Sequence, residues 1–321
     1  MPIIKVEHFG GPDVLQLIDK PDPVPADGQL LVTVKAAGVN FADVAARAGR
    51  YPGVPSAPFY PGLETAGIVS KVGPGVYGYV VGDRVIGLLR GGGYASAAIL
   101  DASSAAKLPD SLDFSPASSL LVQGLTAYFL LHYGKSGPGK TVLISSAAGG
   151  LGSLAIQLAK LDGAKVIGLA SKSKHERVKE LGADFVVDYT QPGWFQEVLS
   201  VTDGKGVDLY LDSSGDLAGE GFDTLGAGSH WLIYGGQGAA GKPLVAQKLG
   251  QIIGKSITLR GYTLYSDIGL GNVASALSKL LDLAELGKLR IDVQSFPLDK
   301  AAEAHIAIES RKTSGKVVLI P

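Results

Sequence analysis

A glycine-rich turn is the feature of this sequence with the clearest chemistry. Six residues end an apolar run that starts at Thr141 and begin the helical pattern LGSLAIQLAK: Ala147, Ala148, Gly149, Gly150, Leu151 and Gly152. Gly149, which has no Cβ, lets the backbone approach a phosphate, and the N-terminus of the helix offers unpaired N–H groups and a positive dipole end. The segment KVIGLA (165–170) follows at the distance of a parallel strand.

This strand, turn and helix predict a site for the pyrophosphate of a dinucleotide, lined by Ala148, Gly149, Gly150, Leu151 and Gly152. The alternative is a plain strand-to-helix turn, because Ala147 stands where the usual G-x-G-x-x-G pattern has its first glycine. The strand–helix–strand context favours the cofactor site.

The end of the second strand indicates which dinucleotide binds. NAD-specific folds usually carry Asp or Glu about 20 residues past the glycines, whereas this chain has Ala170 and Ser171, followed by Lys172 and Lys174. A lysine and a hydroxyl attract a 2′-phosphate that a carboxylate would repel. We therefore predict NADPH, with Ser171 and Lys174 as ligands and Lys174 preferred over Lys172. The alternative for both lysines is a solvated first helical turn.

The composition indicates an ordinary globular protein that acts on small molecules. The 321 residues are 46% hydrophobic and 18% charged, and 29 basic residues balance 30 acidic ones, so neither nucleic acid nor an anionic membrane is an expected partner. Cysteine is absent, which excludes disulfides, thiolate metal ligands and a cysteine nucleophile. No apolar run has the length of a membrane span. We expect a cytoplasmic protein.

The elements that must position the turn fall into three segments. Residues 1–121 hold most of the prolines and short β-rich runs, which predicts a mostly β domain. Residues 122–264 alternate strands and helices, which predicts a cofactor-binding domain with a doubly wound α/β sheet of six strands. Residues 265–321 predict a helix, a strand, a helix and a last strand that return to the first domain.

The whole chain resembles a zinc-independent medium-chain dehydrogenase/reductase of the quinone oxidoreductase (zeta-crystallin-like) family. The segments that carry the resemblance are AAGVNFADV, PGLETAGIVSKVGPGV, VGDRVIG, GGYASAAIL, VQGLTAYFLL, AAGGLG, ASKSKHERVKELGAD, VDLYLDSSG and GKVVLIP. The resemblance implies a Rossmann domain combined with a GroES-like catalytic domain. It also implies a homodimer in which the sixth Rossmann strands pair, and ITLRGYTL has the β-rich composition for edge pairing.

The resemblance also bears on metal. Superfamily members that use zinc have a cysteine ligand where this chain has Asn40 and a histidine ligand where it has Leu63. The residue count agrees, because a catalytic zinc needs about three protein ligands and none of the five histidines is in an H-x-x-x-H arrangement. We predict no metal site. Without a Lewis acid, removal of hydride from an alcohol is disfavoured.

Reduction of an electrophilic acceptor remains, since NADPH can deliver hydride directly to a quinone or an activated alkene. We predict a metal-independent reductase with a small-molecule acceptor. Two alternatives stay open: a reductase specific for enals or enones, and a low-turnover NADPH-binding protein with a binding role.

The resemblance implies three candidate catalytic residues. Asn40 would lie beside the nicotinamide ribose and the substrate, or it would only form a turn. Asp43 is the second candidate, with helix capping as its alternative. Tyr51 matches an active-site tyrosine of the quinone reductases that could stack on a quinone or bond to it, and its alternative is a buried loop tyrosine. Ala45 replaces a second tyrosine of the family and leaves a roomier pocket.

Further cofactor contacts are implied by the same resemblance. Those on the nicotinamide side are Asn40, Gln123, Gly124 and Thr126, together with Thr263 at the end of the sixth strand. A helix N-terminus is the alternative explanation for Gln123, Gly124 and Thr126. Those at the other strand ends are Tyr189, Ser213, Ser214 and the segment Tyr234, Gly235, Gly236 and Gln237. Arg311 aligns with an arginine near the 2′-phosphate, and its alternative is a surface charge.

Overall fold

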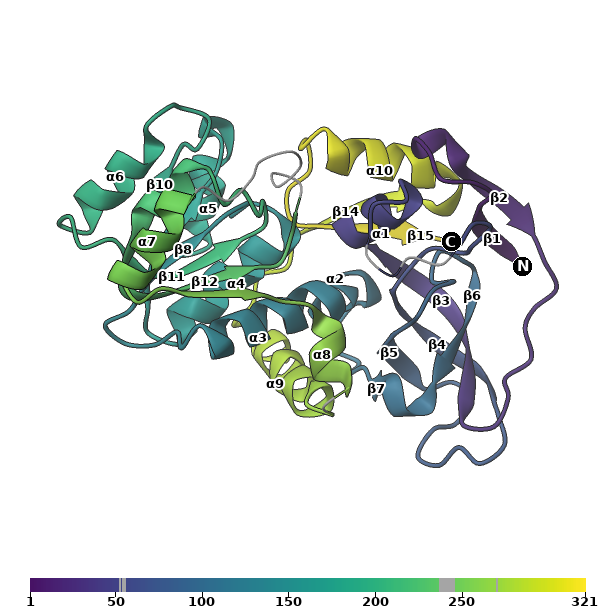
Figure 1. The fold of residues 1–321 in the computed structure, drawn as a ribbon. Helices are drawn as coiled ribbons and strands as arrows, with labels where there is room; N and C mark the ends of the chain where they lie inside the picture. Colours follow the sequence, from purple (N-terminus) through teal and green to yellow (C-terminus); the bar gives the residue numbers. More distant parts are fainter. Residues whose placement is uncertain (52, 54–55, 237–245, 270) are drawn as a thin grey trace. The chain divides into compact units, whose positions relative to one another are not determined.

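The computed structural model describes residues 1–321 apart from 52, 54–55, 237–245 and 270, and the chain forms two compact units (Figure 1). Unit 1 comprises Met1–Leu125 and Val273–Pro321, and unit 2 comprises Thr126–Asn272. The C-terminal segment from Val273 belongs to unit 1, and the units meet in sequence at 125/126 and 272/273.

Hydrogen bonds tie the residues near both borders to their own units. Residues Leu120–Leu125 form a π-helical turn, and the N–H of Val122 in that turn donates to Glu64 of unit 1 at 2.7 Å. At the other border, Asp267 accepts hydrogen bonds from the hydroxyls of Tyr133 and Tyr262, which both belong to unit 2. Such tertiary bonds leave no trace in the local sequence pattern.

Unit 2 contains the predicted doubly wound sheet. In its described part, six parallel strands lie in the order β10-β9-β8-β11-β12-β13. The strands are β8 (Thr141–Ile144), β9 (Lys165–Leu169), β10 (Phe185–Val187), β11 (Val207–Asp212), β12 (Leu225–Ile233) and β13 (Thr258–Gly261). The helices are α3 (Thr126–Tyr133), α4 (Gly150–Leu161), α5 (His175–Glu180), α6 (Trp194–Val201), α7 (Ala246–Gly254) and α8 (Leu264–Gly269). The Rossmann fold class is confirmed.

The sheet of unit 2 is built around apolar strands. Residues 142–144 of β8 are fully buried, as expected for a central parallel strand covered on both faces. Trp231 of β12 stacks on Tyr210 with ring centroids 5.9 Å apart, and Val198 of α6 packs in the same core. The strand order changes direction between β8 and β11, so their carboxyl ends form the crevice where such sheets bind ligands.

Unit 1 is mostly β. Its described residues form a seven-stranded sheet, in which β14-β15-β3-β4-β5-β7 are neighbours and β6 pairs with β3, and a separate β1–β2 hairpin. The strands are β1 (Pro2–Val6), β2 (Leu15–Asp19), β3 (Gln29–Val39), β4 (Glu64–Val72), β5 (Arg84–Leu88), β6 (Ala97–Asp101), β7 (Ala105–Lys107), β14 (Val293–Pro297) and β15 (Lys316–Ile320). The helices are α1 (Phe41–Arg47), α2 (Phe114–Ser118), α9 (Val273–Glu285) and α10 (Ala301–Glu309).

The pairing of β15 with β3 determines what surrounds the start of α1. The two strands are antiparallel, with Val317 opposite Val39 and Val318 opposite Gly38. This register brings Lys316, the first residue of β15, next to Asn40, which directly follows β3. No helix in the described ranges combines the length and hydropathy needed to cross a bilayer.

Candidate active site

The predicted phosphate turn has the geometry of an anion-binding helix start. Helix α4 begins at Gly150 and runs for 12 residues, and Gly149 occupies the N-cap position with extended backbone angles and no side-chain cap. The first N–H groups of α4 are thus free of a capping side chain. A Cβ at Gly152 would lie 2.4 Å from the carbonyl oxygen of Ser146, so only glycine allows this close packing. Ala148 is buried, and Leu151 is partly buried.

Three serine hydroxyls lie beside this turn, and only one of them was predicted. Ser145 donates from Oγ to Oγ of Ser213 at 2.9 Å, and Ser146 Oγ lies 2.8 Å from the same atom. Ser213 also donates its backbone N–H to Ser145 at 2.7 Å. Ser146 has a positive φ of 50°. The sequence signal for the two missed residues is the pair of serines between an apolar strand and the glycines.

The predicted 2′-phosphate ligands lie just after β9. Ser171 is partly buried, and its Oγ lies 3.5 Å from Oγ of Ser173. Lys174 is partly buried, and this burial lowers the pKa of its ammonium group, whereas Lys172 is exposed. The two lysines thus differ in exposure, and their part in binding a phosphate stays a prediction. Tyr189 follows β10 and packs against the core of unit 2.

The other predicted contacts at strand ends have mixed surroundings. Ser214 donates from both N and Oγ to Asp212, at 2.7 and 2.8 Å, so its hydroxyl hydrogen is already used. Tyr234 and Gly235 are partly buried after β12, Gly236 is exposed, and Gln237 lies outside the described residues. Thr263 is exposed after β13. Arg311 is an exposed residue of unit 1, just past the end of α10.

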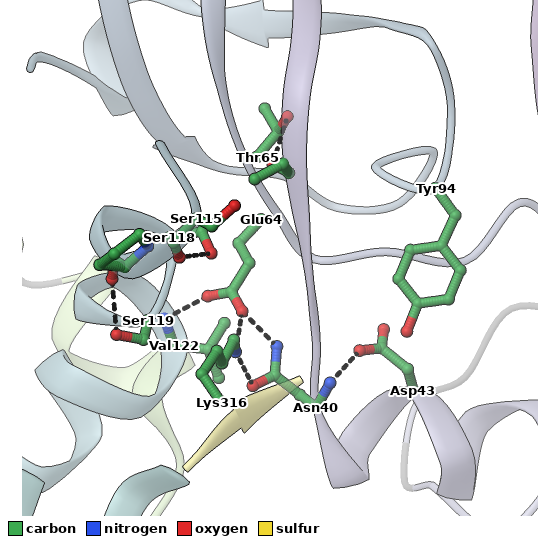
Figure 2. A network of polar contacts seen from close by, with 12 residues as sticks. Asn40, Asp43, Glu64, Thr65, Tyr94, Ser115, Ser118, Ser119, Val122 and Lys316 are labelled. Carbon is green, nitrogen blue, oxygen red and sulfur yellow. Dashed lines mark hydrogen bonds and ion pairs between the residues drawn. The ribbon is translucent and has the colours of Figure 1, made fainter. Parts of the chain in front are cut away.

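Asn40 belongs to a buried polar cluster in unit 1, shown in Figure 2. It is 3% exposed and forms the N-cap of α1. Its amide nitrogen donates to Oε1 of Glu64 at 2.7 Å, and its Oδ1 accepts from Nζ of Lys316 at 2.9 Å. Lys316 also donates to Glu64. Both ends of the amide are fixed, which leaves one N–H and one oxygen lone pair for other partners.

Glu64 and Lys316 are two further residues that sequence reasoning missed. Their side chains are 0% and 1% exposed, so this is an ion pair removed from water. Gly38 on β3 makes the room, because a Cβ there would lie 2.0 Å from Oε1 of Glu64. The available signals were the acidic residue in PGLE and the lysine that opens the apolar run KVVLI. Neither signal indicates a partner.

Asp43 lies on the other side of Asn40 and is 2% exposed. Its Oδ2 accepts the backbone N–H of Asn40 at 2.8 Å, which is the bond of a capping box. Burial raises the pKa of Asp43 to about 7, and the hydrogen bond from Asn40 opposes this shift. The contact of Asp43 with Asn40 is therefore that of a helix cap, as in the alternative, and the raised pKa also brings the Asp43 carboxyl group close to neutral pH.

Three predicted residues lie outside this cluster. Tyr51 is partly exposed and follows α1. Gln123 is in the π-helical turn, and its buried Oε1 has no hydrogen-bond partner among the described residues. Buried polar atoms are normally paired, so this oxygen is available to a ligand. Thr126 is the first residue of α3 and of unit 2 and is buried.

Known proteins match both units. A model of the alcohol dehydrogenase GroES-like domain matches residues 26–110, and a zinc-binding dehydrogenase model matches residues 181–319. Quinone oxidoreductase 1 of Escherichia coli is 35% identical over 99% of both chains. The chain belongs to the quinone oxidoreductase family. Over 98% of its length it is also 33% identical to the human synaptic vesicle membrane protein VAT-1 homolog, covering 84% of that protein.

Solved structures agree with this assignment. The crystal structure of Escherichia coli quinone oxidoreductase complexed with NADPH covers both chains completely, with a TM-score of 0.93 and 34% identity. The resemblance to the family and its GroES-like and Rossmann folds are therefore confirmed, and the protein is an oxidoreductase of this family. Among the described residues, no three His, Asp or Glu side chains gather as a metal site.

Proposed function

We propose that this protein is an NADPH-dependent, metal-independent reductase that transfers hydride to a quinone or an activated alkene. The observation that carries the proposal is the buried Asn40–Glu64–Lys316 cluster. At the position where zinc-using relatives have a cysteine, this chain has an amide whose oxygen already binds an ammonium group. An amide so engaged is a poor metal ligand and a well-oriented hydrogen-bond donor.

Residues of both units are candidates to bind the dinucleotide, and most of them belong to unit 2. The N-terminus of α4 would hold the pyrophosphate through its uncapped N–H groups, with Gly149 and Gly152 allowing the approach. Ser171 and Lys174 would bind the 2′-phosphate, and Arg311 is a further candidate for it. The unpaired Oε1 of Gln123 would accept a hydrogen bond from the nicotinamide end.

When bound, NADPH supplies the hydride, and solvent supplies the proton that completes reduction of the acceptor. The protein's own contribution is to position and polarise. The free N–H of Asn40 would donate to the oxygen on which negative charge develops. Lys316 and Glu64 keep that N–H from rotating, so little reorganisation is needed during the reaction. Tyr51 would contact the acceptor.

A titration tests the cofactor assignment. NADPH and NADH are titrated into the wild type, Lys174→Ala and Lys172→Ala, and binding is followed by cofactor fluorescence. Loss of one charge-assisted bond to the phosphate should weaken NADPH binding by Lys174→Ala about 10- to 100-fold and leave NADH binding unchanged. The exposed Lys172 is the matched control. Equal binding of both cofactors by the wild type would contradict the assignment.

A second experiment tests the reaction. Oxidation of NADPH is followed with a quinone, an enone, an aldehyde and no acceptor, in the wild type and in Asn40→Ala. We expect turnover with the quinone or the enone and a loss of about 100-fold in kcat for the variant, as for removal of one oxyanion donor. Turnover with the enone alone would select the enone-specific alternative, and a flat trace with every acceptor would refute the reductase.

A low-turnover NADPH-binding protein with a binding role is the second candidate. The observation that favours it is the 33% identity to a synaptic vesicle membrane protein VAT-1 homolog. Tight NADPH binding combined with no turnover on any acceptor would select this function.

We also propose a cytoplasmic homodimer. Strand β13 is at the end of its sheet, and apolar side chains on β13 and its neighbours are exposed: Leu249 and Ile253 of α7, Leu259 of β13, and Tyr265 and Ile268 of α8. An open apolar edge favours pairing with a second copy. Light scattering should give twice the chain mass of 33.0 kDa, and Leu259→Lys should give the monomer. The cysteine-free sequence supports a reducing compartment.

A further inference from the structure

Beyond Asp43, a chain of buried polar groups continues into α10. Tyr94 and His305 are both 0% exposed, and Oη of Tyr94 lies 3.2 Å from Nε2 of His305. Their rings meet edge to face, with centroids 5.8 Å apart. In Figure 2 the Tyr94 hydroxyl points toward the Asp43 carboxyl group. Burial raises the pKa of Asp43, and the Tyr94 hydroxyl is one of the groups that oppose this shift. The proposed mechanism gives Tyr94 and His305 no task.

The hydrogens of this chain can be assigned from its unpaired atom. Burial, and secondarily the charge of Arg47, lowers the pKa of His305 to about 3, so the ring is neutral and carries one N–H. Nδ1 of His305 is buried and has no partner in the described part of the chain. A buried unpaired N–H is rarer in proteins than an under-used acceptor. The hydrogen therefore belongs on Nε2, where Tyr94 accepts it.

The hydrogen on Nε2 of His305 determines which group donates in each hydrogen bond between His305, Tyr94 and Asp43. Because the oxygen of Tyr94 accepts from His305, its own hydrogen is free to point at Asp43. Burial and the neighbouring Asp43 charge raise the pKa of Tyr94, so the phenol stays protonated. Asp43 then accepts from the Tyr94 hydroxyl and from the backbone N–H of Asn40. Both interactions favour the ionised form of Asp43.

Protonation of Asp43 would run against this arrangement. A protonated carboxyl group would donate to Tyr94, the phenol hydrogen would turn to Nε2, and the imidazole hydrogen would move to the unpaired Nδ1. The charged groups around the chain form two pairs: Glu64 with Lys316, and Arg47 with Glu309, at 2.7 Å. Of these, Glu64 disfavours and Lys316 favours the Asp43 carboxylate.

We propose that Tyr94 and His305 are positioning residues that hold Asp43 as a carboxylate, so that Asp43 can fix Asn40 at the start of α1. The effect of these residues on turnover rests on the proposed function. The tautomer of His305 and the charge of Asp43 can be tested without it.

The pH profile of reduction is the first test. Ionised Asp43 binds the backbone N–H of Asn40 more strongly than the protonated carboxyl group does, so kcat should rise with pH through the pKa of Asp43, which is about 7. Tyr94→Phe keeps the ring but removes the hydroxyl that points toward the carboxylate, and should move this rise upward by about 1 to 2 pH units. Tyr79→Phe, which loses a bond to the carbonyl oxygen of Ala105 in the same unit, should leave the profile unchanged. A Tyr94→Phe profile equal to that of the wild type would overturn the proposal.

The second test needs no turnover. Nitrogen-15 NMR of histidine-labelled wild-type protein should show His305 as the Nε2–H tautomer between pH 6 and 8, and an Nδ1–H tautomer would overturn the assignment. His305→Gln, which keeps an amide donor, should retain more of the wild-type pH profile than His305→Leu; equal profiles would count against the role of this donor. If no acceptor oxidises NADPH, the proposed function fails while the NMR result still decides the inference.

Discussion

Replacement of Lys316 by methionine is the sharpest test of the buried cluster. The methionine side chain is about as long as that of lysine but is apolar, so Lys316→Met removes the ammonium group with little change in packing. Glu64 then keeps the donors Asn40 and Val122 but loses its counter-charge. Oδ1 of Asn40 also loses its partner.

The magnitude follows from burial. The side chains of Glu64 and Lys316 are 0% and 1% exposed, so solvent cannot compensate the carboxylate that remains. Removing one partner of such a pair costs about 3 to 5 kcal/mol of unfolding free energy. The double variant Glu64→Gln/Lys316→Met removes both charges and should regain part of this loss, because an uncharged cluster carries no desolvation penalty.

Hydrogen exchange measured on peptides of β3, β4 and β15 reports this change within unit 1. A loss of 3 kcal/mol or more should speed exchange of the most protected amides about 100-fold or more. Both tryptophans, Trp194 and Trp231, belong to unit 2, so their fluorescence follows the other unit in the same sample.

The matched control is Lys300→Met. Lys300 pairs with Glu303 at 2.8 Å, but both side chains are at least half exposed, so its loss should leave exchange unchanged. If Lys316→Met changed exchange less than 5-fold, or no more than Lys300→Met, the reasoning that this pair is buried and charged would be refuted.

Three further predictions follow from close contacts and from charge. Gly38→Ala should displace Glu64 and lower both stability and kcat, whereas Gly250→Ala, on an exposed stretch of α7 with nothing near the new Cβ, should be neutral or stabilising by up to about 1 kcal/mol; thermal melts compare the two. Ser146→Gly should melt higher than Ser146→Ala, because only glycine relieves the positive φ; equal melting temperatures would contradict this. Below about pH 7 the native state keeps a proton on Asp43 that the unfolded chain releases above about pH 4, so this group should make the free energy of unfolding fall as the pH rises from 4 to 7. Asp43→Asn should flatten that part of the stability curve in urea titrations.

Much of the fold could be predicted from the sequence. The alternation of apolar strands and helices between Lys140 and Leu264 predicts six parallel strands, and the structure has them. The sequence pattern does not show bonds between distant residues, such as those of Glu64 to Val122 and of Tyr133 to Asp267. Periodicity describes which face of an element is apolar, but it does not say which element covers that face.

The candidate site divides in the same way. The turn from Ala147 to Gly152 is determined by the sequence itself, because its glycines and the helix start lie within six residues and need no distant partner. The family resemblance pointed to Asn40 as a candidate, but it did not point to Glu64 and Lys316, which hold the Asn40 side chain. Lys316 is 276 residues from Asn40 and 252 from Glu64, and in the sequence it looks like a charge at the start of a terminal strand.

Only the tertiary structure decided that this lysine is buried. The antiparallel register of β15 on β3 places it beside Asn40, and the missing side chain of Gly38 leaves space for Glu64. A buried charge is tolerated only with a partner, and that partner is chosen by strand pairing across the chain rather than by local pattern. The sequence by itself therefore determined the glycine turn and helix start at which we propose that a dinucleotide phosphate binds, and the fold decided how the Asn40 amide is held.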